Sequence, residues 1–263
     1  MGLAFDLQAG YATNPGTTIT PLSNRAGDSF AVKSFAPSAA AYLELLLRKS
    51  TSAGIIRVRS PLMHDYVQGI RYACPTGGST CLLADYTAQQ LYSQDQLVVE
   101  ITGASSGTDV GVIGIYYTDL GGASARLAMP GDVFGRVRHV LAIEVDCTAS
   151  STIGAWADTL ITATQDTLHA NTDYAVLGYT LDTAVAAVAI RGTDVSNMRC
   201  GGPGVVDANE TRDWFVKLSN ITGRPHIPII NSANKNATYV SVVDNAASTT
   251  TNVSLILAEL RAA

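Results

Sequence analysis

Short runs of apolar residues, separated by Gly, Ser, Thr, Asn and Pro, recur along most of the chain. The segment 137–145 alternates cleanly, with Val137, Leu141, Ile143 and Val145 at every second position or a multiple of it. Such alternation places one set of side chains on one face of a strand. The same reading predicts strands over 29–35, 42–48, 55–59, 96–102, 110–117, 137–145, 174–181, 185–191, 214–218, 226–230, 238–243 and 253–260.

The segments 42–48 and 55–59 are separated by a Ser/Thr/Gly loop, which favours a hairpin, and 96–102 with 110–117 favours a second one. Helical spacing is also compatible with 42–48. Two helices are predicted, over 85–93 and 156–168. Many short strands joined by small polar loops are typical of a sandwich or barrel, not of a doubly wound α/β sheet.

Residues 1–28 are rich in Gly, Thr, Pro and Asn and carry only scattered apolar residues. We interpret this segment as an extended N-terminal arm that docks on its own domain or on a neighbour. The remainder, 29–263, is expected to form the β-sandwich. A stretch rich in Gly and Pro near 120–132 allows a division into two modules, 29–120 and 133–263, and no internal sequence repeat decides between one module and two.

Composition narrows the classes of function. Charged residues make up 15% of the 263 residues, against a usual share of about 25%, while hydrophobic residues make up 47%. So few charges favour a chain that buries outer surface against neighbours, although small polar residues can also fill an exposed surface. The net charge of −5 disfavours direct contact with nucleic acid. No apolar run is long enough for a membrane span, and the start of the chain shows no secretion signal, so we expect assembly in a host cytoplasm and reduced cysteines.

Motifs of catalysis are not found. No His-Glu-x-x-His, Gly-x-Ser-x-Gly or phosphate-binding loop occurs, and the glycine-rich run 201–204 contains a proline that removes a backbone donor. His64 and Asp65 are adjacent, and neighbours on a strand point to opposite faces. We therefore predict no enzymatic activity, no catalytic residue, no cofactor and no metal site. Calcium bound by loop aspartates between subunits, and a bridge between Cys74 and Cys81, stay open alternatives.

The polar N-terminal segment, the short strands with Ser/Thr loops and the apolar C-terminal run 255–261 together resemble the layout of viral, phage-type jelly-roll capsid or virion proteins. The resemblance implies a mainly β fold, a jelly-roll-like antiparallel β-sandwich with one or two short helices, either single and elaborated or two small ones in tandem. It also implies a virion structural protein whose partners are copies of itself, in a trimer or a larger shell, and other virion proteins. Whether such a protein would be a major capsid, cement, spike-base or tail component is left open.

Large aromatic side chains are the anchors that subunit contacts use most. The residues predicted for this role are Tyr11, Tyr116, Tyr117, Trp156 and Trp214, and the two tryptophans serve equally well as core residues. Two rival functions fit the same fold class. A carbohydrate-binding or adhesin-like β module would use exposed aromatics, and a β-sandwich glycoside hydrolase would need two converging acids.

Overall fold

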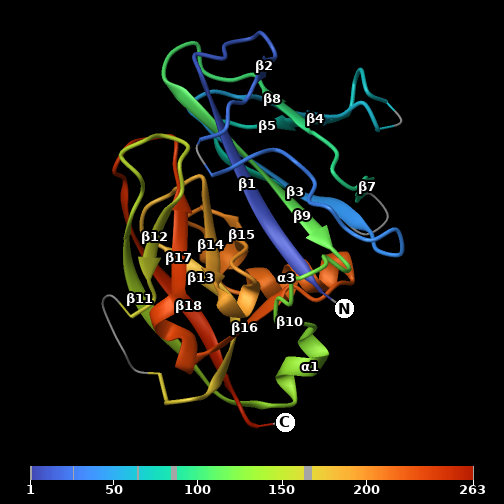
Figure 1. The fold of residues 1–263 in the computed structure, drawn as a ribbon. Helices are drawn as coiled ribbons and strands as arrows, with labels where there is room; N and C mark the ends of the chain where they lie inside the picture. Colours follow the sequence, from blue (N-terminus) through green and yellow to red (C-terminus); the bar gives the residue numbers. More distant parts are fainter. Residues whose placement is uncertain (1, 26, 64, 84–87, 163–167, 263) are drawn as a thin grey trace.

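A computed structural model describes residues 2–25, 27–63, 65–83, 88–162 and 168–262 of the chain. Within these ranges most of the regular structure is β-strand (Figure 1). The strands fall into four antiparallel sheets, two built from the first half of the chain and two from the second.

The first half forms a sandwich of two sheets. One sheet has the strand order β1-β9-β3-β6, and β7 pairs with the same edge of β3 as β6 does. The other has the order β2-β8-β4-β5. The strands of this sandwich are β1 (Ala4–Thr13), β2 (Thr20–Pro21), β3 (Ala41–Ser50), β4 (Gly54–Arg59), β5 (Ile70–Cys74), β6 (Gly77–Leu82), β7 (Gln89–Leu91), β8 (Val98–Ile101) and β9 (Thr108–Tyr117).

The second half forms another sandwich. Its sheets have the orders β10-β16-β13-β18-β11 and β12-β17-β14-β15. The strands are β10 (Leu127–Ala128), β11 (Val137–Thr148), β12 (Ala157–Leu160), β13 (Asp173–Leu181), β14 (Ala187–Gly192), β15 (Cys200–Pro203), β16 (Ile227–Asn231), β17 (Thr238–Val243) and β18 (Thr250–Leu260).

The two halves repeat one topology. The order β1-β9-β3-β6 corresponds to β11-β18-β13-β16, and β2-β8-β4-β5 corresponds to β12-β17-β14-β15. In each half, most connections pass from one sheet to the other, whereas β4–β5 and β14–β15 are hairpins within one sheet. The strand pairs β1–β9 and β11–β18 bring the beginning and the end of each half side by side. This is the jelly-roll arrangement of an antiparallel double sheet. Of the two architectures that the sequence left open, the structure therefore has two jelly rolls in tandem.

Short helices occur in the connections. α1 (Pro130–Phe134) precedes β11, while α2 (Ala208–Thr211) and α3 (Trp214–Thr222) connect β15 to β16. Two short 3₁₀-helices, η1 (Thr193–Val195) and η2 (Ser232–Ala237), follow β14 and β16. Gly178 on β13 permits the close approach of α2, because a Cβ there would lie 2.4 Å from the carbonyl oxygen of Thr211.

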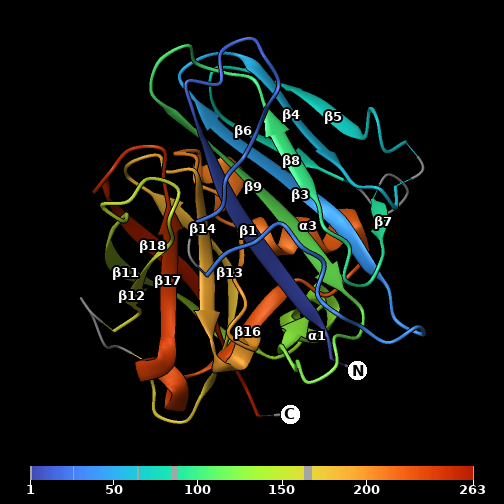
Figure 2. The same ribbon diagram turned by 45° about the horizontal axis from the view of Figure 1, so that its top comes forward.

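The layers are stacked so that one sheet is covered on both faces. Figure 2 shows β4, β5 and β8 on one side of β1, β3 and β9, with the second sandwich on the other side. One apolar cluster fills the first sandwich and contains Leu43, Ile56 and Ile113. A second cluster fills the second sandwich and extends to Phe5 and Val112 on the opposite face of the shared sheet. A sheet buried on both faces explains the nearly continuous apolar run of β9.

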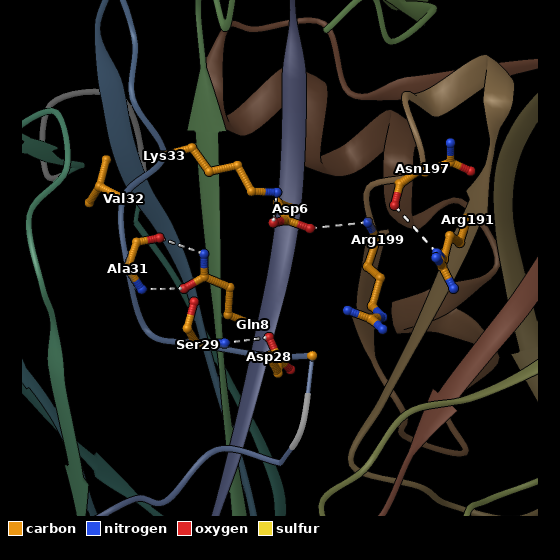
Figure 3. Close-up of a pocket in the computed structure, with 11 residues that line it drawn as sticks. Asp6, Gln8, Asp28, Ser29, Ala31, Val32, Lys33, Arg191, Asn197 and Arg199 are labelled. Atoms are coloured by element: carbon orange, nitrogen blue, oxygen red, sulfur yellow. Dashed lines mark hydrogen bonds and ion pairs between the residues drawn. The ribbon is translucent and has the colours of Figure 1, made fainter.

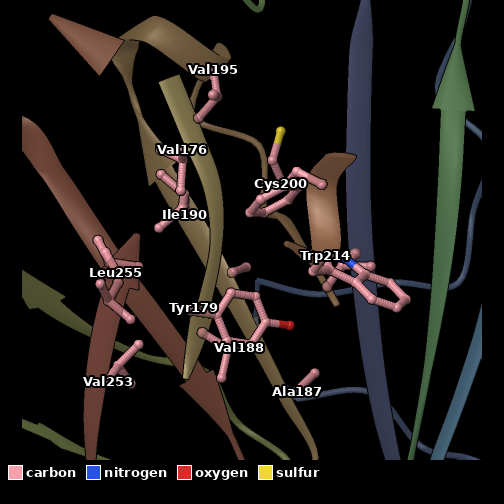
Figure 4. Close-up of a cluster of buried hydrophobic side chains, with 14 of the residues drawn as sticks. Val176, Tyr179, Ala187, Val188, Ile190, Val195, Cys200, Trp214, Val253 and Leu255 are labelled. Carbon is pink, nitrogen blue, oxygen red and sulfur yellow. The ribbon is translucent and has the colours of Figure 1, made fainter. Parts of the chain in front are cut away.

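The interior of the second sandwich is closely packed (Figure 4). Val176, Val188 and Leu255, from three different strands, are fully buried there. The hydroxyl of Tyr179 donates to the carbonyl oxygen of Pro203 at 2.9 Å, so this buried polar atom has its partner. Burial holds the pKa of Tyr179 well above its ordinary value.

Several predicted elements differ from the observed ones. Residues 1–28, predicted as an extended arm, contain β1, which pairs with β9 over ten positions and is an edge strand of the sheet β1-β9-β3-β6. Residues 157–160 and 89–91, predicted as helical, form strands, whereas 214–218, predicted as a strand, begins α3. Of the two predicted helices, residues 85–87 and 163–167 lie outside the described residues. The two predicted hairpins are also wrong, because β3 and β4, like β8 and β9, lie in different sheets.

Candidate functional site: the seam between the two sandwiches

The outer face of the sheet β1-β9-β3-β6 packs against the second sandwich: β15 contacts β1, β3 and β6, and α3 contributes to the same apolar cluster. We call this intramolecular contact the seam. Its apolar part comes from Phe5, Leu7, Leu45, Leu47, Val110 and Val112 on the first sandwich, which share one cluster with Trp214, Phe215, Leu218 and Cys200 on the second.

Backbone groups of β1 also bond across the seam. The amide of Leu7 donates to the carbonyl oxygen of Arg199 at 3.0 Å, and the thiol of Cys200 donates to the carbonyl oxygen of Phe5 at 3.3 Å. Burial raises the pKa of the Cys200 thiol far above its ordinary value, so the group stays a protonated donor. The four cysteines of the chain are free thiols.

Charged side chains cross the seam at two further points. Lys49 on β3 lies 2.6 Å from Asp244, which follows β17, and its ammonium also donates to the carbonyl oxygen of Ala184 at 2.8 Å. The Asp244 side chain is 1% exposed. Glu44, also on β3, lies 2.5 Å from the guanidinium of Arg224 and 2.9 Å from the ring of His226.

The cluster around Glu44 is deeply buried. A β-bulge between Leu43 and Leu45 turns Glu44 toward the second sandwich, and its side chain has no exposed surface. The ring of His226 stands edge-on to Phe5 at 4.9 Å and lies 4.9 Å from the ring of Tyr116. Burial and the neighbouring Glu44 charge raise the pKa of Tyr116 above its ordinary value.

A polar cleft of about 260 Å³ opens at one margin of the seam (Figure 3). Asp6 on β1 accepts from Lys33 at 2.7 Å and from the backbone amide of Arg199 at 3.2 Å. Asp28 accepts from the amide of Ala9 at 2.9 Å. Burial raises the pKa of Asp28, against the opposing influence of this hydrogen bond and the Arg199 charge.

Both carboxylates of the cleft thus have donors from the chain itself. Asp28 additionally accepts from the indole nitrogen of Trp156 at 3.1 Å, which ties the first sandwich to the second. The hydrogen bonds from Arg199 to Asp6 and from Trp156 to Asp28 therefore connect the second sandwich to the first.

The aromatic residues predicted as contacts between subunits lie at the seam or in a core. Tyr116, Tyr117 and Trp214 are 1%, 0% and 2% exposed within one chain. Their prediction as anchors for another subunit is therefore wrong, because no surface is left to bury. Tyr117 belongs to the core of the first sandwich, and the indole of Trp214 donates to the carbonyl oxygen of Gly201 at 3.1 Å.

Tyr11 and Trp156 are half-buried at the same margin as the cleft. The guanidinium of Arg25 stacks on the ring of Tyr11 at 3.6 Å, and that of Arg199 lies 5.1 Å from the ring of Trp156. Arg25 also donates to the carbonyl oxygen of Ile153 at 2.9 Å. This hydrogen bond connects the first half of the chain to the second at the margin of the seam. Sequence reasoning missed the charged residues of the seam, and the isolated Glu44 within an apolar strand was the one signal that pointed to them.

No protein-family model and no curated protein sequence matches the chain. Among solved structures it is similar to the major capsid protein P2 of bacteriophage PM2, with 9% identity, 98% of each chain covered and a TM-score of 0.27. It is also similar to a chain in the atomic structure of Sulfolobus turreted icosahedral virus, with 10% identity, 98% of this chain and 79% of that one covered, and a TM-score of 0.24. For the major capsid protein of that virus the values are 7% identity, 97% and 96% coverage, and a TM-score of 0.18.

The resemblance is to viral capsid structures. At these TM-scores the likeness carries no argument about function, and the proposal below rests on the geometry of the chain. Among the described residues, no helix has the length and apolar character needed to cross a membrane.

Proposed function

We propose that the chain is a virion structural protein, a self-assembling capsid-type subunit that acts through contacts with copies of itself. The observation that carries the proposal is the comparison of two matching sheet faces. In the first jelly roll the outer face of β1-β9-β3-β6 is covered by the second jelly roll. In the second jelly roll the corresponding strands β11 and β18 carry a face that the chain leaves open.

The open face has apolar side chains in contact positions. Val140 on β11 is 55% exposed, and Ile256 on β18 and Leu177 on β13 are partly exposed beside it. These three side chains line one wall of a shallow groove of about 430 Å³, whose other lining residues are Ala208, Asn209, Arg212, Asp213 and Lys217. Exposed apolar side chains that lie together on a sheet face indicate an interaction site, because soluble monomers rarely expose such surface. The occupant that we assign is the first jelly roll of another copy, because the seam shows this type of sheet packing against a jelly roll.

A second group of exposed apolar residues lies at the far end of the first sandwich. Leu62, Tyr66 and Val67 between β4 and β5 are 51%, 61% and 54% exposed, and Tyr92 after β7 is 54% exposed. Apolar groups on two separate parts of the surface suit a subunit that meets more than one neighbour. The low share of charged residues, 15%, supports the same interpretation, because the surface of a lone soluble monomer usually carries more charge.

The test is the mass of the purified chain by light scattering on a sizing column, with negative-stain images of the same peak. Shells, sheets or a stable trimer are expected. A charge placed on the open face, Val140→Asp, is expected to shift the mass toward 27.5 kDa, the mass of one chain. Ser151→Asp places the same charge on the exposed loop between β11 and β12 and is the matched control.

Retained folding of each variant is checked by circular dichroism. A wild-type chain that stays at the mass of one monomer over a wide concentration range would contradict self-assembly as the function. Equal assembly of the Val140→Asp and Ser151→Asp variants would contradict the assigned face.

A further inference from the structure

Three metal-ligating side chains converge at one end of the second sandwich, the end where the C-terminus lies in Figure 1. The Nε2 atom of His139 lies 2.6 Å from the Oε2 atom of Glu259, and the Nδ1 atom of His169 lies 2.9 Å from the same oxygen. All three ligand atoms lie within 4.8 Å of one another. This cluster is separate from the seam and from the open face of β11 and β18.

The fold brings these residues together from three segments. His139 on β11 lies directly opposite Glu259 on β18, next to a β-bulge between Val137 and His139. The bulge lets two successive residues reach the same partner, because Arg138 also bonds the carboxylate, through Oε1 at 3.0 Å. Glu259 is the last inward-facing residue of β18, after the buried Leu255 and Leu257.

The third residue, His169, lies in the connection before β13, and its backbone is held at both ends. Its amide donates to the hydroxyl of Tyr174 at 2.8 Å. Its carbonyl oxygen accepts from the hydroxyl of Ser232 at 2.6 Å. A ligand whose backbone is fixed by two hydrogen bonds is preorganised, which is the property that binding sites require.

The three side chains differ in how far they are exposed to solvent. The Glu259 side chain is 1% exposed, whereas those of His139 and His169 are 49% and 65% exposed. A buried carboxylate at the floor and two imidazoles at the rim leave one side of the cluster open to solvent.

We propose that His139 Nε2, His169 Nδ1 and Glu259 Oε2 form a binding site for one divalent ion of the zinc class. Two imidazoles and one carboxylate suit zinc, with bonds of about 2.0–2.2 Å. Tetrahedral bonds of that length separate ligand atoms by roughly 3.3 Å, so the contacts of His139 and His169 to Oε2, 2.6 and 2.9 Å long, need to open by about 0.7 and about 0.4 Å. The exposed imidazoles can rotate to do so, and the fourth position faces solvent.

Arg138 is the nearby cation that opposes the ion. Its side chain is 56% exposed and bonds the other oxygen of the carboxylate, Oε1, so Oε2 stays available. Removing this positive charge is expected to tighten binding, while removing a ligand is expected to weaken it strongly. The opposite signs of these two effects separate a metal site from a hydrogen-bonded network of the same residues.

The experiment titrates the purified, metal-free chain with Co²⁺ and with Zn²⁺. Co²⁺ is followed by the visible absorption of tetrahedral cobalt, and Zn²⁺ by calorimetry and by displacement of cobalt. One ion per chain is expected. His169→Ala and Glu259→Gln are expected to weaken binding by about 100-fold or more, and Arg138→Gln is expected to strengthen it several-fold.

Glu144→Gln changes an exposed carboxylate on the same strand as His139 and is expected to bind as the wild type does. Circular dichroism verifies folding, and His169→Ala, at the exposed rim, keeps the test open if Glu259→Gln does not fold. A wild-type chain without the tetrahedral cobalt spectrum, or equal affinities of His169→Ala and wild type, would overturn the site. Failure of this test leaves the assembly of the chain unaffected, since the two readouts are independent.

Discussion

Two buried carboxylates at the seam, Glu44 and Asp244, each have a cationic partner from the other sandwich. Glu44 reaches Arg224 and His226, and Lys49 reaches Asp244, so β3 alone supplies two of the crossing contacts. Such a buried ion pair stabilises the fold little more than a pair of apolar side chains would. The free energy needed to remove both charges from water nearly cancels the free energy of their attraction. Its effect on specificity is larger, since a displaced seam would leave these charges buried without partners.

Replacing Glu44 by Gln tests this dependence. The change keeps the size of the side chain and removes the charge that faces Arg224 and His226. We expect the free energy of unfolding to fall by about 3–5 kcal/mol, the usual effect of removing one member of a buried pair. Urea unfolding measures it, and Glu144→Gln, on an exposed position of β11, should stay within about 0.5 kcal/mol of wild type. Equal midpoints for both variants would show that the Glu44 cluster adds no stability.

Acid should weaken the pair of Arg126 and Asp173 at the start of β13. The hydrogen bonds from Arg126 lower the pKa of Asp173 below its ordinary 3.8, with burial opposing. A carboxyl with a lowered folded pKa stabilises the fold above pH 3.8, and this contribution is lost as the pH falls through the folded value. We expect the stability difference between wild type and Asp173→Asn to shrink steadily below pH 3.8 in denaturant titrations. A difference that stays constant down to pH 2 would contradict the assigned cause.

Among the strands, β15 shows how closely an element can be packed. A Cβ on Gly202 would lie 2.2 Å from the indole nitrogen of Trp214, the first residue of α3. Gly202→Ala is expected to destabilise the chain by about 1–3 kcal/mol, because Trp214 must move and its bond to Gly201 is strained. Gly131→Ala, where a Cβ meets no atom within 4 Å, should be neutral or slightly stabilising. Thermal unfolding of both variants checks the contrast.

A strand can be predicted from the sequence where its apolar residues are compatible with only one type of secondary structure. β9 and β18 were predicted within two or three residues because their apolar runs are long. β1 was missed because its inward positions include Asp6 and Gln8, whose partners Lys33 and Ala31 lie far along the chain. The predicted strand at 214–218 is a helix, since a run of five apolar and mixed residues fits either period.

The seam itself was only partly predictable. Four of the five aromatic residues chosen as contact anchors, Tyr11, Tyr116, Trp156 and Trp214, do lie in or against the cluster that joins the sandwiches. The sequence indicates that such side chains need a large partner surface, but the partner is fixed by topology. Strand order in a jelly roll depends on connections between distant segments, which no local pattern records.

At the level of the whole molecule, the two jelly rolls share one apolar cluster and should unfold together. The outer face of β1-β9-β3-β6 would be exposed if the second sandwich opened alone. We expect a single calorimetric transition whose calorimetric and van't Hoff enthalpies agree when the chain is kept monomeric by Val140→Asp. Two resolved transitions would show that the seam is weaker than either core.

The seam joins two different surfaces of similar folding units, so it is a head-to-tail contact within one chain. When a contact of this kind repeats between chains, the rotation that it imposes decides the product: a rotation that divides a full turn gives a closed ring, and any other gives an open helical filament. If another copy docks on the face of β11 and β18 as proposed, the angle between the two sandwiches of one chain already sets that choice. Seam substitutions that tilt one sandwich against the other would then change the symmetry of the particle without touching any surface between subunits.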